Sequence, residues 1–271
     1  MIPLKDQEFI RSKFDQALID PVKIEFFTQR EMAIYVHGRE PCVYCKPTQE
    51  VLQELVALSD KISLHTHFRE EEPKETAKYS IDRIPAIVVR AEGRRAGRSR
   101  DGGRMLKFFG MPSGNEFAIF VETIVDISQG TSLLSEKSKR ALRKVKEDIR
   151  IQVFVTPTCP YCPQMVRTAY HLALDNPHIQ AEVVEINEFP DLAQRYEVQA
   201  VPLTIINDAV IIPGAVPENV FVEQVVKVAR GTGVAEQAPA ASTESSSKTP
   251  TQSRQEPSQR GQRLPSGLYI P

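Results

Sequence analysis

Several patterns that would assign this chain to a class at once are missing or scarce. Basic residues do not outnumber acidic ones, since Lys and Arg total 34 and Asp and Glu total 35. A nucleic-acid-binding domain usually carries a basic excess, so this balance argues against that class. No window approaches 18 apolar residues, and the opening MIPLKDQEFIRSKFDQ lacks the apolar core of a signal peptide. We therefore expect a cytoplasmic protein that binds neither nucleic acid nor a membrane.

Cysteine is equally scarce, with four among the 271 residues. They form two Cys-x-x-Cys pairs, Cys42 with Cys45 in EPCVYCKPT and Cys159 with Cys162 in VTPTCPYCPQM. A secreted disulfide scaffold spreads its cysteines through a small chain, whereas tight pairs indicate redox or metal chemistry. The length allows two compact domains with a sizeable core.

The chain contains two copies of one plan, the kind of internal repeat that decides a fold. In each copy a Cys pair is followed by an amphipathic helical pattern, a strand-like segment, and an X-Pro pair that opens a β-branched strand. Cys42 precedes Pro85 by 43 residues, and Cys159 precedes Pro202 by the same 43. Both copies end in a Gly, a Pro-containing turn and an amphipathic helix, as in FFGMPSGNEFAIFVETIV.

This repetition predicts an α/β fold of two tandem domains, each a central mixed β-sheet flanked by helices. We place domain one at residues 1–130 and domain two at residues 131–231. Residues 232–271 are rich in Ser, Thr, Gln, Pro and Ala. We expect this tail to be disordered, because it buries too little to offset its ordering entropy.

The two copies differ in the hairpin that follows the X-Pro strand. The second copy turns tightly around Asn207 and Asp208, whereas the first carries the Arg-rich insertion RAEGRRAGRSRDGGR. We interpret the insertion as a solvated hairpin tip. Docking of an acidic partner is the alternative.

Each Cys pair lies where a strand gives way to a helix. Unpaired N–H groups and the positive end of the helix dipole favour thiolate over thiol there. The thiolate of the first cysteine of each pair is stabilised most by these groups. We therefore assign Cys42 and Cys159 as nucleophiles, and Cys45 and Cys162 as the residues that resolve the mixed disulfide. Pro160 suits the first helical position, where its missing N–H costs nothing.

The X-Pro pairs complete each candidate site. We predict that Ile84-Pro85 and Val201-Pro202 are cis and lie opposite the Cys pairs, where they would offer a substrate chain strand-like hydrogen bonds. A cis bond occurs in only about 5–6% of X-Pro pairs. The repeated spacing is what supports the prediction.

The plan as a whole resembles thioredoxin and glutaredoxin, and CPYC is the glutaredoxin motif. Two such units with CVYC and then TPTCPYCP resemble the tandem protein disulfide oxidoreductases of thermophilic prokaryotes. The resemblance covers about residues 1–230. It implies two active motifs, with the C-terminal CPYC the more important, and electrons from a thioredoxin-reductase-like flavoprotein. We expect the protein to need no metal and no tightly bound cofactor of its own.

The chain departs from single-domain thioredoxin in two respects. It has no tryptophan, and Pro41 and Thr158 stand where a Trp usually precedes the motif. Val36 and Val153 stand where thioredoxin has a buried Asp. A buried proton acceptor would have to come from elsewhere, and Glu185 in the apolar AEVVEI strand is one candidate.

Three other readings remain open. The cysteines could hold structural zinc, but 113 residues separate Cys45 from Cys159 and each pair has its own fold copy. They could hold an iron–sulfur cluster across a dimer, which the Pro of CPYC disfavours. The chain could also be a dedicated electron carrier for a peroxidase such as a peroxiredoxin, which uses the same exchange chemistry as a disulfide oxidoreductase.

Overall fold

The computed structural model describes residues 2–30, 41–92, 105–232, 262–263 and 269–270. The first half of the chain forms α1 (Leu4–Ala17), β1 (Val22–Thr28), α2 (Cys45–Val56), β2 (Ile62–Phe68), α3 (Pro73–Lys78), β3 (Ala86–Ala91), β4 (Met105–Phe109) and α4 (Asn115–Gln129). The second half forms α5 (Glu136–Leu142), β5 (Ile149–Val155), α6 (Cys162–Asp175), β6 (Ile179–Glu185), the 3-10 turn η1 (Ile186–Glu188), α7 (Pro190–Arg195), β7 (Leu203–Ile206), β8 (Val210–Pro213) and α8 (Glu218–Ala229).

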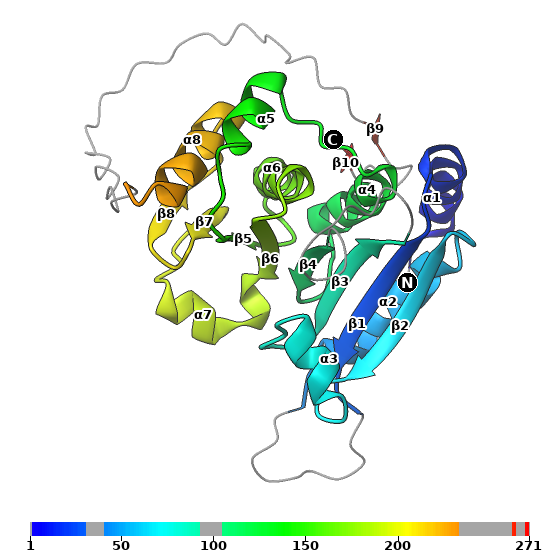
Figure 1. Ribbon diagram of the computed structural model, residues 1–271. Helices are drawn as coiled ribbons and strands as arrows, with labels where there is room; N and C mark the ends of the chain where they lie inside the picture. Colours follow the sequence, from blue (N-terminus) through cyan, green and yellow to red (C-terminus); the bar gives the residue numbers. More distant parts are fainter. Residues whose placement is uncertain (1, 31–40, 93–104, 233–261, 264–268, 271) are drawn as a thin grey trace, which may run out of the picture.

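The strands form one eight-stranded sheet in the order β2-β1-β3-β4-β6-β5-β7-β8. In the first half β1 runs parallel to β2 and antiparallel to β3, which is antiparallel to β4. The second half repeats this arrangement with β5, β6, β7 and β8. The predicted repeat is therefore present as two equivalent half-sheets that share one continuous sheet (Figure 1). None of the helices in the described part of the chain is both long and apolar enough to cross a bilayer.

The inner strands of the sheet, such as β1 and β5, are buried on both faces and read as nearly continuous apolar runs, whereas the edge strands β2 and β8 alternate between buried and exposed residues. Along β1, Ile24 and Phe26 belong to the larger core, together with buried residues of α1, α2, α4, α6 and α8. Phe27 points to the opposite face, into a smaller core that contains Tyr79 after α3 and Leu192 of α7. Alternate residues of a strand point to opposite faces, so this one strand serves both cores.

The two half-sheets meet where β4 pairs in parallel with β6. The register places Lys107 opposite Glu182, and Phe108 and Phe109 opposite Val183 and Val184. The Lys107 ammonium lies 3.3 Å from the Glu182 carboxylate, and both side chains are buried. Arg150 of β5 donates to the other oxygen of Glu182 at 2.8 Å. The junction between the halves therefore contains a buried ion pair among apolar neighbours.

The hairpin of the second half has the predicted tight turn. Asn207 and Asp208 connect β7 to β8 with φ angles of 50° and 55°. Asn and Asp tolerate this left-handed region better than other residues with a β-carbon. In the first half the connection between β3 and β4 contains the Arg-rich insertion, of which residues 93–104 lie outside the described residues.

Most of the predicted disordered tail, residues 233–261, 264–268 and 271, also lies outside the described residues. Gln262–Arg263 (β9) and Tyr269–Ile270 (β10) form a short antiparallel pair, and β10 contacts α4 (Figure 1). Tyr269 and Ile270 belong to LPSGLYIP, the end of the tail that regains apolar residues.

We predict that Glu182→Ala lowers the free energy of unfolding by about 3–5 kcal/mol, because it leaves the buried Lys107 ammonium without its carboxylate. Denaturant unfolding of the two proteins measures the difference. Glu223→Ala is the matched control, since Glu223 forms an exposed ion pair with Lys227 and should change stability by less than about 0.5 kcal/mol. Similar effects of the two substitutions would contradict a special role for the buried pair.

Candidate active site

The second Cys pair lies between the end of β5 and the start of α6. Cys159 and Cys162 form a disulfide with their Cα atoms 5.5 Å apart. α6 begins at Cys162, so Pro160 precedes the helix and Pro163 occupies its first turn. The prediction that Pro160 takes the first helical position is therefore wrong, a boundary difference of the size that helix ends often show.

The nucleophile assigned from sequence, Cys159, is held where a negative sulfur is stabilised. The backbone N–H of Cys162 points at its Sγ, with 3.1 Å between nitrogen and sulfur. This N–H belongs to the first turn of α6 and has no acceptor within the helix. A thiolate at Cys159 would accept this hydrogen bond and lie at the positive end of the helix dipole. Cys159 is 6% exposed and Cys162 is fully buried, so the first sulfur is the reachable one.

The first half of the chain supports the loop that carries Cys159. The N–H of Asn115, the first residue of α4, donates to the Pro157 carbonyl at 3.0 Å, and its side-chain amide donates to the Cys159 carbonyl at 3.2 Å. The approach is so close that a β-carbon on Gly114 would overlap the Pro157 carbonyl oxygen. Gly114 also has a φ of +55°, which favours glycine. The PSGNEF segment thus anchors the Cys loop of the other half.

Glu116, one residue further along α4, is a site residue that the sequence did not identify. It lines an internal cavity of about 10 Å³ together with Cys162. The remaining walls are apolar or aromatic: Phe108, Ile119, Phe120, Pro163, Val166 and Tyr170. The space is at the lower limit for one water molecule. Neither carboxyl oxygen of Glu116 has a hydrogen-bond partner among the described residues.

The environment of Glu116 favours its neutral form. Burial, followed by repulsion from Glu185 and Glu188, raises its pKa to about 9. At neutral pH the group is therefore a neutral carboxylic acid beside the cavity that Cys162 also lines. A Glu in the first turn of a helix is usually explained by its favourable interaction with the helix dipole. The sequence position of Glu116 therefore did not indicate that it lies beside a cysteine.

Glu185, the proton acceptor suggested from sequence, has a different surrounding. It is buried, and its two oxygens accept the backbone N–H groups of Asn187 and Glu188, at 3.3 and 3.0 Å. Its pKa is raised, mainly by burial. Glu188 accepts the Met111 N–H at 2.8 Å, and burial raises its pKa to about 7. Glu116, rather than Glu185, shares a cavity with a cysteine.

The first Cys pair is more open than the second. Cys42 and Cys45 form a disulfide with their Cα atoms 5.4 Å apart. Cys45 is the first residue of α2 and is buried, whereas Cys42 is half-buried. An open pocket of about 340 Å³ borders the pair and is lined by Thr28, Gln29, Arg30, Pro41, Cys42, Cys45, Lys46 and Gln49. All of these residues come from the first half, and two of them are cationic. Val36 lies outside the described residues.

Both X-Pro pairs lie next to the strand that leads to their Cys pair. Ile84-Pro85 and Val201-Pro202 are cis. The carbonyl oxygen of Val201 lies 3.6 Å from Cys159 Sγ. In the first half the register of β3 on β1 pairs Ala86 with Phe27, which puts Pro85 beside Thr28 and hence beside the pocket at Cys42. Their part in substrate binding stays a prediction.

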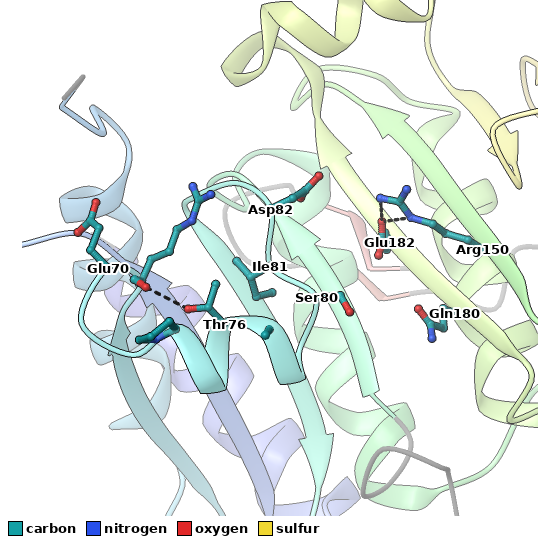
Figure 2. Close-up of a pocket in the computed structure, with 11 residues that line it drawn as sticks. Glu70, Thr76, Ser80, Ile81, Asp82, Arg150, Gln180 and Glu182 are labelled. Atoms are coloured by element: carbon teal, nitrogen blue, oxygen red, sulfur yellow. Dashed lines mark hydrogen bonds and ion pairs between the residues drawn. The ribbon is translucent and has the colours of Figure 1, made fainter. Parts of the chain in front are cut away.

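A larger pocket lies elsewhere. It has a volume of about 860 Å³ and lies between the α3 region and the first residues of β5 and β6. Figure 2 shows its lining residues, among them Arg150 paired with Glu182. Asp82 and Ser80 face it from the first half. None of its lining residues is a cysteine or belongs to an X-Pro pair. Size alone therefore does not identify the reactive site.

Comparison with known proteins agrees with the fold and the Cys pairs. A model of the thioredoxin domain matches residues 149–227. A thioredoxin of Methanocaldococcus jannaschii is 32% identical over 80 residues, which are 29% of this chain and 94% of that protein. The structure of a protein disulfide oxidoreductase from Aeropyrum pernix superposes with a TM-score of 0.71 and 26% identity, over 84% of this chain and 94% of that one.

A longer relative matches more than half of the chain. The F component of alkyl hydroperoxide reductase from Xanthomonas campestris is 25% identical over 158 residues, or 58% of this chain. The match spans 26% of that relative, so this chain corresponds to about a quarter of its length.

We predict that Glu116→Gln stabilises the oxidised protein at neutral pH and not in acid. Because folding raises the pKa of Glu116 from 4.5 to about 9, its favourable contribution is complete below pH 4.5 and is lost as the pH rises toward 9. At pH 7 the wild-type protein should be less stable than the variant by about 3 kcal/mol. Denaturant unfolding at pH 4.5 and pH 7 measures this, and a pH-independent difference would contradict it.

Proposed function

The chain belongs to the thioredoxin family, and we propose that it is a thiol–disulfide oxidoreductase that reduces, forms or isomerises protein disulfides at two Cys-x-x-Cys sites. The environment of Cys159 is the observation that supports this most directly. Its sulfur is the more exposed of a buried pair, faces the N–H of Cys162, and lies beside the Val201 carbonyl.

In the reducing direction the Cys159 thiolate attacks one sulfur of a substrate disulfide. A mixed disulfide forms, and the other substrate sulfur leaves as a thiolate that takes up a proton. Cys162 then attacks Cys159 Sγ, so the substrate leaves as a dithiol and the Cys159–Cys162 disulfide remains. Two electrons pass from the protein to the substrate, and the oxidising direction is the reverse.

Glu116 supplies the proton that this exchange requires. When a donor thiolate opens the Cys159–Cys162 disulfide, Cys162 departs as a thiolate in an apolar cavity where a charge is costly. The neutral Glu116 carboxyl in the same cavity gives it a proton, and the resulting carboxylate takes the proton back when Cys162 attacks the mixed disulfide. A buried general acid and base of this kind typically contributes about 10²–10⁴-fold.

The X-Pro segments form part of the substrate surface in this proposal. The Val201 carbonyl, close to Cys159, can accept a hydrogen bond from the N–H of an extended substrate chain. Ile84 and Pro85 would serve the Cys42 site in the same way. We also propose that residues 1–130 and 131–231 are two domains with unequal roles, since α4 of the first completes the site of the second.

A dedicated electron carrier is the second candidate function. It is favoured by the match of 58% of this chain to about a quarter of the F subunit of an alkyl hydroperoxide reductase. In this role a thioredoxin-reductase-like flavoprotein would reduce the chain, which would reduce a peroxiredoxin. Reduction of insulin disulfides and of an oxidised peroxiredoxin by the same protein, compared at equal concentrations, separates the two. Turnover with the peroxiredoxin alone would favour the carrier.

We predict that Cys159→Ser removes more dithiothreitol-dependent insulin reduction than Cys42→Ser. The second pair has the buried acid and the supporting contacts of α4, whereas the first is open to solvent. Initial rates of the two variants, each with its other Cys pair intact, measure the ranking. Equal losses, or the larger loss from Cys42→Ser, would overturn it.

We predict that Glu116→Gln slows opening of the Cys159–Cys162 disulfide by dithiothreitol at least about tenfold at pH 7, because Gln cannot donate the proton. Stopped-flow reduction in a Cys42→Ser/Cys45→Ser background isolates this pair. Glu122→Gln is the control, since Glu122 is buried on the same helix but pairs with Lys13. Equal rates for the two Gln variants would refute a specific role for Glu116.

A further inference from the structure

We propose that Glu25, His65 and His67 bind a divalent transition-metal ion, for which Zn²⁺ is the natural probe. The three residues lie on adjacent strands, β1 and β2 (Figure 1). The parallel register sets Glu25 opposite His65, and His67 follows on the same face two residues later. One donor atom from each lies within 4.8 Å of the others. From the sequence we expected no metal, and none of these three residues is a cysteine.

The spacing of the donor atoms suits a small tetrahedral ion. Glu25 Oε2 lies 3.0 Å from His67 Nε2 and 3.4 Å from His65 Nδ1. Zinc bonds to nitrogen and oxygen are about 2.0–2.2 Å, so two donors on a zinc tetrahedron lie about 3.3–3.5 Å apart. His65 has a side chain that is 55% exposed, so it can adjust its ring and leave the fourth position to solvent.

The second nitrogen of His67 has the partner that a metal-binding histidine needs. His67 Nδ1 lies 2.7 Å from the Glu72 carboxylate. Without a metal, His67 Nε2 and Glu25 Oε2 are joined by a hydrogen bond of 3.0 Å. When the Nε2 proton is lost to a binding metal, Nδ1–H still donates to the Glu72 carboxylate and the lone pair of Nε2 is free to ligate. A carboxylate that orients the other nitrogen of a ligating histidine typically accounts for about 10–100-fold in metal affinity. This arrangement distinguishes the cluster from a chance meeting of two histidines.

Glu25 is likewise held so that one oxygen remains for a metal. Tyr79 donates to Oε1 at 3.1 Å, Arg90 at 3.0 Å and Lys23 at 3.2 Å. All three donors act on Oε1, and both histidines face Oε2. The fixed carboxylate is thus oriented by three hydrogen bonds on the side away from the proposed ion.

The charges around the cluster permit a cation. Arg90 and Lys23 are positive and oppose a metal. Glu25 and Glu72 are negative, and Glu92 pairs with Arg90 at 3.2 Å. Carboxylates therefore outnumber the fixed cations. Two imidazoles with one carboxylate favour zinc and its neighbours over magnesium or calcium, which prefer oxygen ligands.

The test is calorimetric titration of Zn²⁺ into the full chain without an affinity tag and with both disulfides formed, so that no thiol competes. We expect one Zn²⁺ per chain, a higher melting temperature with the metal, and at least a tenfold loss of affinity in His65→Ala. His65 is largely exposed, so this variant should fold. His178→Ala is the matched control. His178 lies in the second half, where its Nδ1 is 3.2 Å from Asp148, and no second histidine lies beside it among the described residues. The His178→Ala variant should bind Zn²⁺ as tightly as the wild type.

Absence of stoichiometric binding by the oxidised wild-type chain would overturn the proposal. So would a His65→Ala variant that binds as tightly as the wild type, or a loss of binding in His178→Ala. Because thiols are absent in this experiment, its result is independent of the redox activity proposed for the Cys pairs.

Discussion

The pairing of β4 with β6 is the constraint on which the rest of the molecule depends. Three residue pairs join the half-sheets, and one of them is the buried ion pair of Lys107 with Glu182. A buried carboxylate without its cation is far more costly than one exposed to water. The pair therefore disfavours a shift in register, since a slip by one residue would place each charge opposite an apolar neighbour.

That junction fixes where α4 lies. The helix follows β4 directly, so once β4 is aligned with β6 its first turn reaches the loop before Cys159. Gly114 permits the close approach to Pro157, Asn115 holds the Cys159 carbonyl, and Glu116 enters the cavity at Cys162. The chemistry of the second site is thus partly encoded in the first half of the chain.

The sequence could predict what is local or repeated. The Cys motifs and the turn at Asn207 can be recognised within one copy of the repeat, and the 43-residue spacing is recognised because it occurs in both copies. The structure has the turn at Asn207 and a cis bond before each of the two prolines. Glu116 could not be found in this way, because its partner Cys162 belongs to the other copy. His65 and His67 alternate along a half-exposed strand, which is typical of a solvent-facing side. Only the register of β1 on β2 brings Glu25 to them.

The two Cys pairs look alike in sequence and differ in what surrounds them. The described lining of the pocket at Cys42 comes entirely from the first half and includes Arg30 and Lys46, of which Arg30 is paired with Glu71. The site at Cys159 is buried and depends on a helix N–H and a neutral acid, so its electrostatic interactions are screened less by water. The described lining of the pocket at Cys42 comes from its own half, whereas the loop at Cys159 is also held by α4 of the other half.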